Sequence, residues 1–118
     1  MKKIVFLCFI SVSLYVCVSA LGATFGESNA LRAAEEYIEL TPFSYSGLIK
    51  QLEFEDFSHS EAVYAADNCG ANWEEQAVKA AKNYLEITAF SYSGLIKQLE
   101  FEGFTHEQAV YGAKQNGY

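Results

Sequence analysis

Two histidines are the side chains most able to do chemistry near neutral pH. His59 and His106 lie 47 residues apart in matching sequence surroundings, and histidine changes its charge near neutrality. One interpretation is therefore a pH-sensitive contact. Neither histidine has a cysteine or another histidine at metal-binding spacing, so the sequence predicts no metal site. We favour the simpler interpretation, in which both are exposed residues in the first turn of a helix.

Paired carboxylates are the second feature that could suggest catalysis. Glu53 and Glu55 are two residues apart, and side chains at that spacing on a helix point away from each other. No nucleophile or phosphate-cradling loop accompanies them. Cys69 is the single cysteine beyond the N-terminal segment, so it forms no internal disulfide. We expect a binding protein without a cofactor, not an enzyme.

The chain contains an internal repeat, which must position all of these residues. A shift of 47 positions aligns residues 30–70 with residues 77–117, and 26 of the 41 pairs are identical. Each copy contains the uninterrupted block FSYSGLIKQLEFE. Such self-similarity indicates one supersecondary unit used twice.

Apolar residues recur at helical spacing three times in each copy. The stripes cover residues 30–38, 45–52 and 62–66, and again residues 77–85, 92–99 and 109–113. The sequence therefore predicts an all-α fold of two tandem three-helix repeats that resemble helix-turn-helix units. The expected organisation is a short spacer (21–29), the first repeat (30–70), a connector (71–76) and the second repeat (77–118).

Capping residues agree with this division. Pro42 cannot continue the first helix of the first repeat, and Ser44 and Ser91 can cap the second helices. The third helices should open at Ser58 and Thr105, each followed three residues later by an acid or amide that completes a capping box.

The turn between the second and third helices differs between the repeats. Gly103 occupies it in the second repeat, where a left-handed backbone would end the helix. Asp56 stands at the equivalent position of the first repeat and tolerates that conformation at some cost. We therefore expect the first repeat to be the less stable one.

The N-terminal segment has the pattern of a secretory signal. Lys2 and Lys3 precede a long apolar stretch, and cleavage after Ala20 or Gly22 would satisfy the small-residue rule. We favour a cleaved signal peptide over residues 1–20. An uncleaved membrane anchor is the alternative, because the stretch approaches the length that crosses a bilayer. Lipid attachment at Cys17 ranks last, because large residues precede it.

The net charge limits the partners. Without Lys2 and Lys3, six basic residues remain against fifteen acidic ones, a net charge of −9. A negative protein repels the phosphate backbone that supplies most nucleic-acid affinity. We therefore expect a basic protein partner and no nucleic acid, with membrane contact through the N-terminal segment alone.

Each repeat also carries a candidate partner-binding set at its second helix, with a phenylalanine one turn beyond a lysine. The residues are Lys50, Phe54 and Glu55, and Lys97, Phe101 and Glu102. Exposed aromatic residues beside charges are typical of interface anchors. The alternative, which we favour, is that each phenylalanine folds under its helix end to seal a small core.

Trp73 is the sole tryptophan and lies at the junction between the repeats, opposite Gly26 in the alignment. A repeat of about 40 residues is near the lower limit for independent folding. Trp73 is therefore our candidate for packing one repeat on the other.

The repeated sequence resembles a known family. Residues 90–117 read FSYSGLIKQLEFEGFTHEQAVYGAKQNG, residues 43–70 read FSYSGLIKQLEFEDFSHSEAVYAADNCG, and the join reads ANWEEQAVKAAKNYLE. These blocks resemble the Ltp-like host cell surface-exposed lipoprotein repeat. The resemblance implies tandem helix-turn-helix modules displayed outside Gram-positive cells. The lipid-modified cysteine that the family name implies has no good processing site here.

The resemblance also implies a function. Phage-encoded relatives act in superinfection exclusion by blocking DNA entry, which implies a phage tail component, such as the tape-measure protein, as the partner. Our leading hypothesis is an exported protein-binding module of the cell envelope, with phage exclusion as its role. The alternatives are a cell-wall or surface adhesion module and, with cytoplasmic retention, a DNA-binding regulator.

Overall fold

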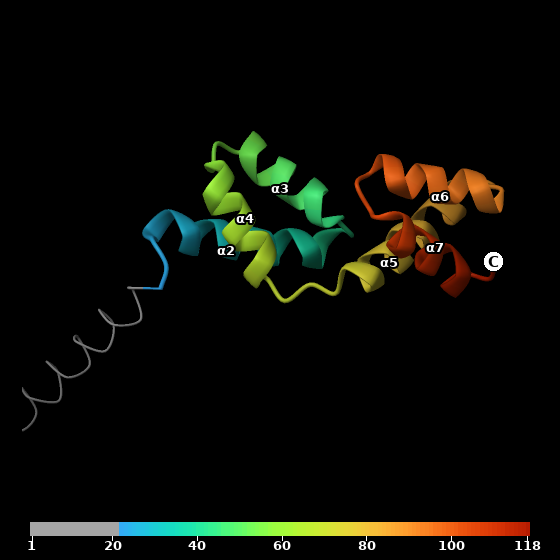
Figure 1. The fold of residues 1–118 in the computed structure, drawn as a ribbon, viewed down its shortest axis with the longest axis horizontal. Helices are drawn as coiled ribbons and strands as arrows, with labels where there is room; N and C mark the ends of the chain where they lie inside the picture. The colour runs from blue at the N-terminus through green and yellow to red at the C-terminus, as the bar shows by residue number, and fades with distance from the viewer. Residues whose placement is uncertain (1–21) are drawn as a thin grey trace, which may run out of the picture.

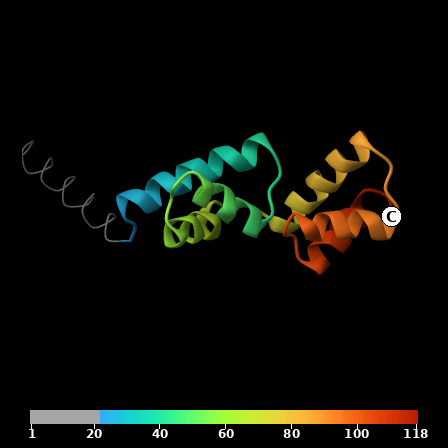
Figure 2. The same cartoon turned by 90° about the horizontal axis from the view of Figure 1, so that it is seen from above.

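The computed structural model describes residues 22–118, which form six α-helices in two three-helix units (Figure 1). The first unit consists of α2 (Phe25–Leu40), α3 (Tyr45–Phe54) and α4 (His59–Asn68), and the second of α5 (Trp73–Ile87), α6 (Tyr92–Phe101) and α7 (His106–Gln115). The units follow one another along the long axis, and a short connection joins α4 to α5 (Figure 2). The predicted all-α fold of two three-helix repeats is confirmed.

The N-terminal expectations lie outside the described residues. These are the signal peptide of residues 1–20, its cleavage after Ala20 and lipid attachment at Cys17. Within residues 22–118, no helix is long and apolar enough to cross a bilayer.

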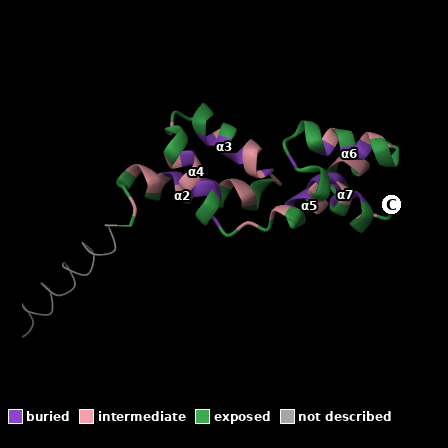
Figure 3. Cartoon of the chain, in the orientation of Figure 1, coloured by how far each residue is buried: buried purple, intermediate pink, exposed green. Residues whose placement is uncertain are grey.

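Each unit has its own apolar core, which runs along the inner faces of its three helices (Figure 3). Leu48 and Leu52 are fully buried in the first unit, as Leu95 and Leu99 are in the second. The first and third helices of each unit meet mainly through buried alanines. Small side chains let these helices approach closely, so the large leucines of the second helix can fill the remaining space.

The predicted caps are confirmed. The Ser44 hydroxyl accepts a hydrogen bond from the Gly47 amide at 2.9 Å, and the Ser91 hydroxyl accepts the equivalent bond at 3.0 Å. Ser58 and Thr105 form complete capping boxes with the third residue of α4 and α7 respectively.

Two helices begin before the bounds of the repeats that the alignment gives. Residues 25–29, expected in the spacer, form the start of α2, because Thr24 and Glu27 make a further capping box that satisfies its first amides. Residues 73–76, expected in the connector, belong to α5, where Asn72 accepts a hydrogen bond from the Glu75 amide at 3.1 Å. In both places a polar cap extends the helix beyond its apolar stripe.

The turn after the second helix has the predicted left-handed residue in both units. Asp56 has φ 71° and Gly103 has φ 107°. The next amide, of Phe57 or Phe104, donates to the carbonyl of Leu52 or Leu99 at 3.2 and 3.1 Å. This is the Schellman arrangement, in which the chain folds back over the last turn of the helix.

The turn also explains why the favoured role of Phe54 and Phe101 is wrong. These side chains are 83% and 86% exposed, so they do not seal the core. The phenylalanine after the turn does so instead: Phe104 is 4% exposed and Phe57 is half-buried against the first core. The fold-back places the later residue over the core and leaves the earlier one facing outward.

Candidate functional site

Large apolar side chains lie exposed at equivalent places in both units. Besides Phe54 and Phe101, Leu40 is 81% exposed at the end of α2, and Ile87 is 79% exposed at the end of α5. Solvent also reaches the other predicted partner-binding residues, Lys50, Glu55, Lys97 and Glu102. Each unit therefore presents an apolar and charged surface near the ends of its first and second helices.

In the first unit, part of this surface is hollowed. The space is about 260 Å³, and its lining residues come from α2 and the end of α3. We call it the first-repeat groove; it is lined by Ala33, Glu36, Tyr37, Leu40 and Glu55. Its floor is apolar and aromatic, and carboxylates stand at its edge. Leu40 and its counterpart Ile87 were not predicted from the sequence, although two apolar residues repeated at a helix end were a visible signal.

The equivalent groove of the second unit is partly covered by the chain itself. Its residues Ala80, Asn83, Tyr84 and Glu102 line a remaining space of about 80 Å³ together with Thr41 and Pro42 of the first unit. We call these four residues the second-repeat groove, and residues 41–46, which lead from α2 into α3, the junction segment. The same surface is therefore open in one repeat and covered in the other.

Hydrogen bonds hold the junction segment in place. The Phe43 amide donates to Oε1 of the buried Gln76 at 2.9 Å. The Ser44 hydroxyl donates to the Glu102 carbonyl at 2.7 Å, and the Ser46 hydroxyl donates to the Gly103 carbonyl at 3.2 Å. Glu102, predicted as a partner-binding residue, thus lies at the junction between the repeats. Its counterpart Glu55 lines the first-repeat groove, to which the other repeat contributes no residue.

The second-repeat groove contains a tyrosine with a raised pKa. Burial and then a hydrogen bond to Glu102 raise the pKa of Tyr84, and a hydrogen bond from Gln98 opposes the shift. The Gln98 amide donates to the Tyr84 hydroxyl at 3.2 Å, and the Gln51 amide makes the equivalent bond to Tyr37 at 3.4 Å. The grooves thus share their internal polar contact and differ in what covers them.

Trp73 opens α5 and packs against the core of the first unit. Its ring lies 5.5 Å from that of Tyr45, edge to face. The Tyr45 hydroxyl in turn donates to Asp67 at 2.7 Å. The indole therefore attaches the first helix of one repeat to the second helix of the other.

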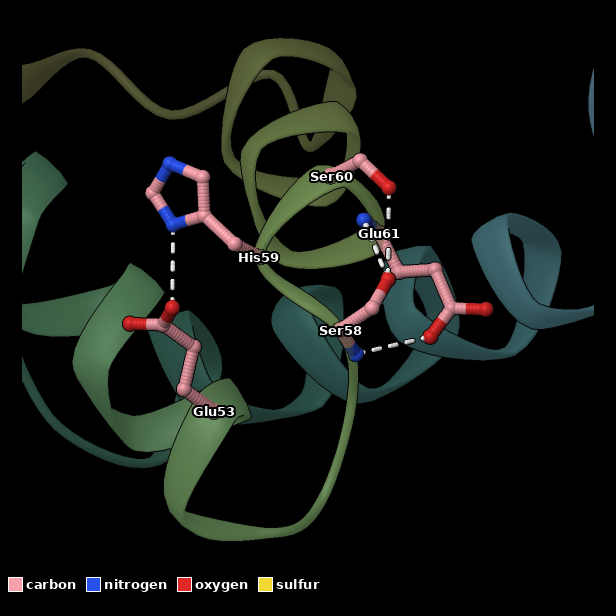
Figure 4. A network of polar contacts seen from close by, with 5 residues as sticks. All are labelled: Glu53, Ser58, His59, Ser60 and Glu61. Carbon is pink, nitrogen blue, oxygen red and sulfur yellow. Dashed lines mark hydrogen bonds and ion pairs between the residues drawn. The ribbon is translucent and has the colours of Figure 1, made fainter.

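The histidines contact carboxylates across the turn between the second and third helices. His59 Nδ1 lies 2.9 Å from Glu53 Oε2, beside the Ser58–Glu61 capping box (Figure 4). His106 and Glu100 repeat the contact at 3.1 Å. The imidazoles are 73% and 70% exposed. Each pair therefore links the second helix to the third at the surface and does not form a buried reactive site. Residues 22–118 contain no cluster of three metal-binding side chains, and Cys69 is buried with a free thiol.

The negative charge is concentrated in one repeat. Residues 30–70 contain eight acidic and two basic side chains, a net charge of −6, whereas residues 77–117 contain four of each. The acidic groove residue Glu36 has Asn83 as its counterpart, and Asp56 has Gly103. The negative electrostatic field of the chain therefore arises mainly from the first repeat.

Fold and surface together define a small module of two tandem three-helix units that exposes large apolar and charged side chains. The chain belongs to the Lipoprotein_Ltp family of host cell surface-exposed lipoproteins, whose family model matches residues 27–69 and 72–115. The two matched segments correspond to the two structural repeats, so the family predicted from the sequence is confirmed.

One solved structure is similar to this chain over most of its length. It is Ltp, a superinfection exclusion protein from the Streptococcus thermophilus temperate phage TP-J34. The TM-score is 0.73 at 29% sequence identity, and the match covers 78% of this chain and 96% of that one. A comparison with curated proteins gives no significant match.

Proposed function

We propose that this chain is an exported protein of the cell envelope that prevents superinfection by binding a basic protein of an incoming phage. The observation that carries the proposal is the similarity to a superinfection exclusion protein over both repeats. The family description, host cell surface-exposed lipoprotein, supports a location at the cell surface.

The charge distribution supports a protein partner over a nucleic acid. With a net charge of −6 on residues 30–70, the first repeat repels phosphate groups and attracts lysine and arginine side chains. A tail component such as the tape-measure protein is a partner of suitable chemistry if it carries a basic segment. Binding such a component outside the membrane would stop DNA entry without preventing adsorption.

The experiment is a phage panel plated on a sensitive Gram-positive host that expresses the chain. We expect unchanged adsorption, loss of DNA entry and a fall in plating efficiency for at least one phage. The matched control is the same chain without residues 1–20, which we expect to remain inside the cell and give no protection.

Two outcomes would contradict the proposal. Equal protection by the internal control would show that export is not needed. No protection against any phage, together with binding of the chain to isolated cell walls, would favour an adhesion module.

A further inference from the structure

We propose that the basic partner binds in the first-repeat groove, as an extended segment that carries lysine or arginine beside small apolar residues. This inference rests on the proposed function and deepens it, because it assigns the binding site. Its template is the junction segment, which partly covers the equivalent groove of the second repeat.

The template shows what kind of ligand the groove accepts. Thr41 and Pro42 lie over the second-repeat groove, and the hydroxyls of Ser44 and Ser46 donate to carbonyls at the turn after α6. Before Pro42 the backbone is extended: Thr41 has φ −157° and ψ 152°. An extended chain with a small apolar residue on α5 and hydrogen-bond donors at the α6 turn therefore fits this surface.

The first-repeat groove keeps the shape-determining residues and changes the charge. Tyr37 and Glu55 correspond to Tyr84 and Glu102, so the floor and one rim are retained. Glu36 replaces Asn83 at the groove, and Asp56 replaces Gly103 at the turn. Two carboxylates thus stand where the junction segment meets neutral groups. A ligand for the first repeat should place cations at those points.

A second copy of this chain is a poor occupant. The segment equivalent to residues 41–46 is residues 88–93, which carry no basic residue. It is also partly covered, because the Tyr118 hydroxyl donates to the Phe90 carbonyl and the Tyr118 ring lies 5.6 Å from that of Tyr92. A side chain at position 103 would collide with Ser46 Oγ, and Asp56 places such a side chain in the first repeat. These features block head-to-tail stacking, which would otherwise continue without closure.

The test uses the exported chain and two synthetic peptides in an NMR titration. One peptide has the sequence of residues 41–46 with a lysine on each side, and the matched peptide has a glutamate on each side. We expect the lysine peptide to shift the resonances of Tyr37, Leu40 and Glu55 but not those of Tyr84, and to bind about tenfold more tightly than the glutamate peptide.

Two charge reversals on neighbouring positions of α2 provide the matched variants. Glu36→Lys changes the groove, whereas Glu35→Lys makes the same change in net charge at an exposed residue that does not line it. We expect Glu36→Lys to weaken the lysine peptide about tenfold and Glu35→Lys to weaken it about twofold, through the general field. Lys82 stands at the position equivalent to Glu35, so α2 should tolerate that substitution.

The inference is overturned if the lysine peptide shifts both repeats equally, if both peptides bind alike, or if the two variants weaken binding alike. It is also overturned if groove resonances shift with protein concentration without peptide, which would identify a second copy as the occupant. In the phage assay, full exclusion by both variants would reject the groove while the proposed function stands. Failure of the unaltered chain to exclude phage would reject the function, and the titration would still decide the groove.

Discussion

The two repeats share their internal construction and differ in what surrounds them. Both use the same serine caps, the same left-handed turn and the same pair of buried leucines in the second helix. Yet residues 30–70 carry a net charge of −6 while residues 77–117 are neutral. The comparison teaches that the residues which shape each groove and most of each core are retained, whereas charged positions such as Glu36 and Asp56 are replaced by the neutral Asn83 and Gly103.

The aromatic contact at the start of the second helix also differs between the repeats. Trp73, whose counterpart in the alignment is Gly26, starts the second repeat and packs on Tyr45 of the first. In the second repeat, Tyr118 lies against Tyr92, the counterpart of Tyr45. Equivalent tyrosines are thus covered by different aromatic residues.

The largest effect is expected from Gly103→Ala, which changes the contact between the turn after α6 and the junction segment. An added Cβ would collide with Ser46 Oγ and lie 2.7 Å from Ser44 Oγ. With the left-handed backbone at this position, we expect a loss of about 2–3 kcal/mol in the free energy of unfolding. Urea unfolding followed by Trp73 fluorescence would measure it.

The control for that variant is Gly117→Ala. Gly117 has φ 112°, and nothing would lie within 4 Å of its Cβ, so this change tests backbone conformation without a clash. Equal losses in the two variants would show that the junction contacts contribute no stability.

A smaller loss is expected from Gly112→Ala, at a position where the helix packing of the two repeats differs. An added Cβ would lie 2.7 Å from the Ala77 carbonyl oxygen, while the equivalent residue of the first repeat is already Ala65. Overpacking costs about 1–3 kcal/mol and exceeds the helix-propensity gain of about 1 kcal/mol. We expect a net loss of about 1 kcal/mol in thermal or urea unfolding.

The paired variant is Ala65→Gly in the first repeat, which removes a methyl group from the same place in α4. It should lose about 1 kcal/mol through helix propensity and about 0.8 kcal/mol through the lost burial of the methyl group, because Ala65 is fully buried. If Gly112→Ala stabilised the protein instead, α5 and α7 would be free to move apart, and the close approach would have no energetic role.

The smallest effect, and the one opposite in sign, is expected from Asp56→Gly. Asp56 has φ 71°, which glycine adopts without steric cost. We expect a gain of about 0.5 kcal/mol in stability, measured as a rise of about 2–4 °C in melting temperature. The same change removes a carboxylate from the turn directly after the groove residue Glu55, so binding of the lysine peptide should weaken as stability rises.

No change in melting temperature would mean that Asp56 bears no backbone strain, and the predicted lower stability of the first repeat would then lose its cause. A gain in both stability and peptide affinity would contradict an electrostatic role of Asp56 beside the first-repeat groove.

Local interactions made much of the fold predictable. Ser58 and Thr105 predict the starts of the third helices, because a capping box involves residues three apart in the chain. Asp56 and Gly103 indicate the turn for the same reason. Thr24 was missed, although it forms an equivalent box with Glu27, because no apolar stripe in the aligned repeat pointed to a helix start there.

The candidate site was predictable only in part. Lys50, Phe54 and Glu55 are exposed as a partner-binding surface requires, but the favoured burial of Phe54 was wrong because Phe57 folds back over the core instead. The excess of acid in the first repeat could have been counted from the sequence. The groove could not, since Tyr37 and Glu55 are 18 residues apart and meet through packing.

The amino-acid sequence by itself determined the family, the duplicated three-helix unit, its caps and its turns, because these depend on residues close together in the chain. The tertiary structure alone decided that the junction segment partly covers one copy of the groove and leaves the other open. The reason is that the repeats are similar in sequence but differ in surroundings: the second-repeat groove lies against residues of the first repeat, whereas the first-repeat groove is lined by residues of its own repeat alone.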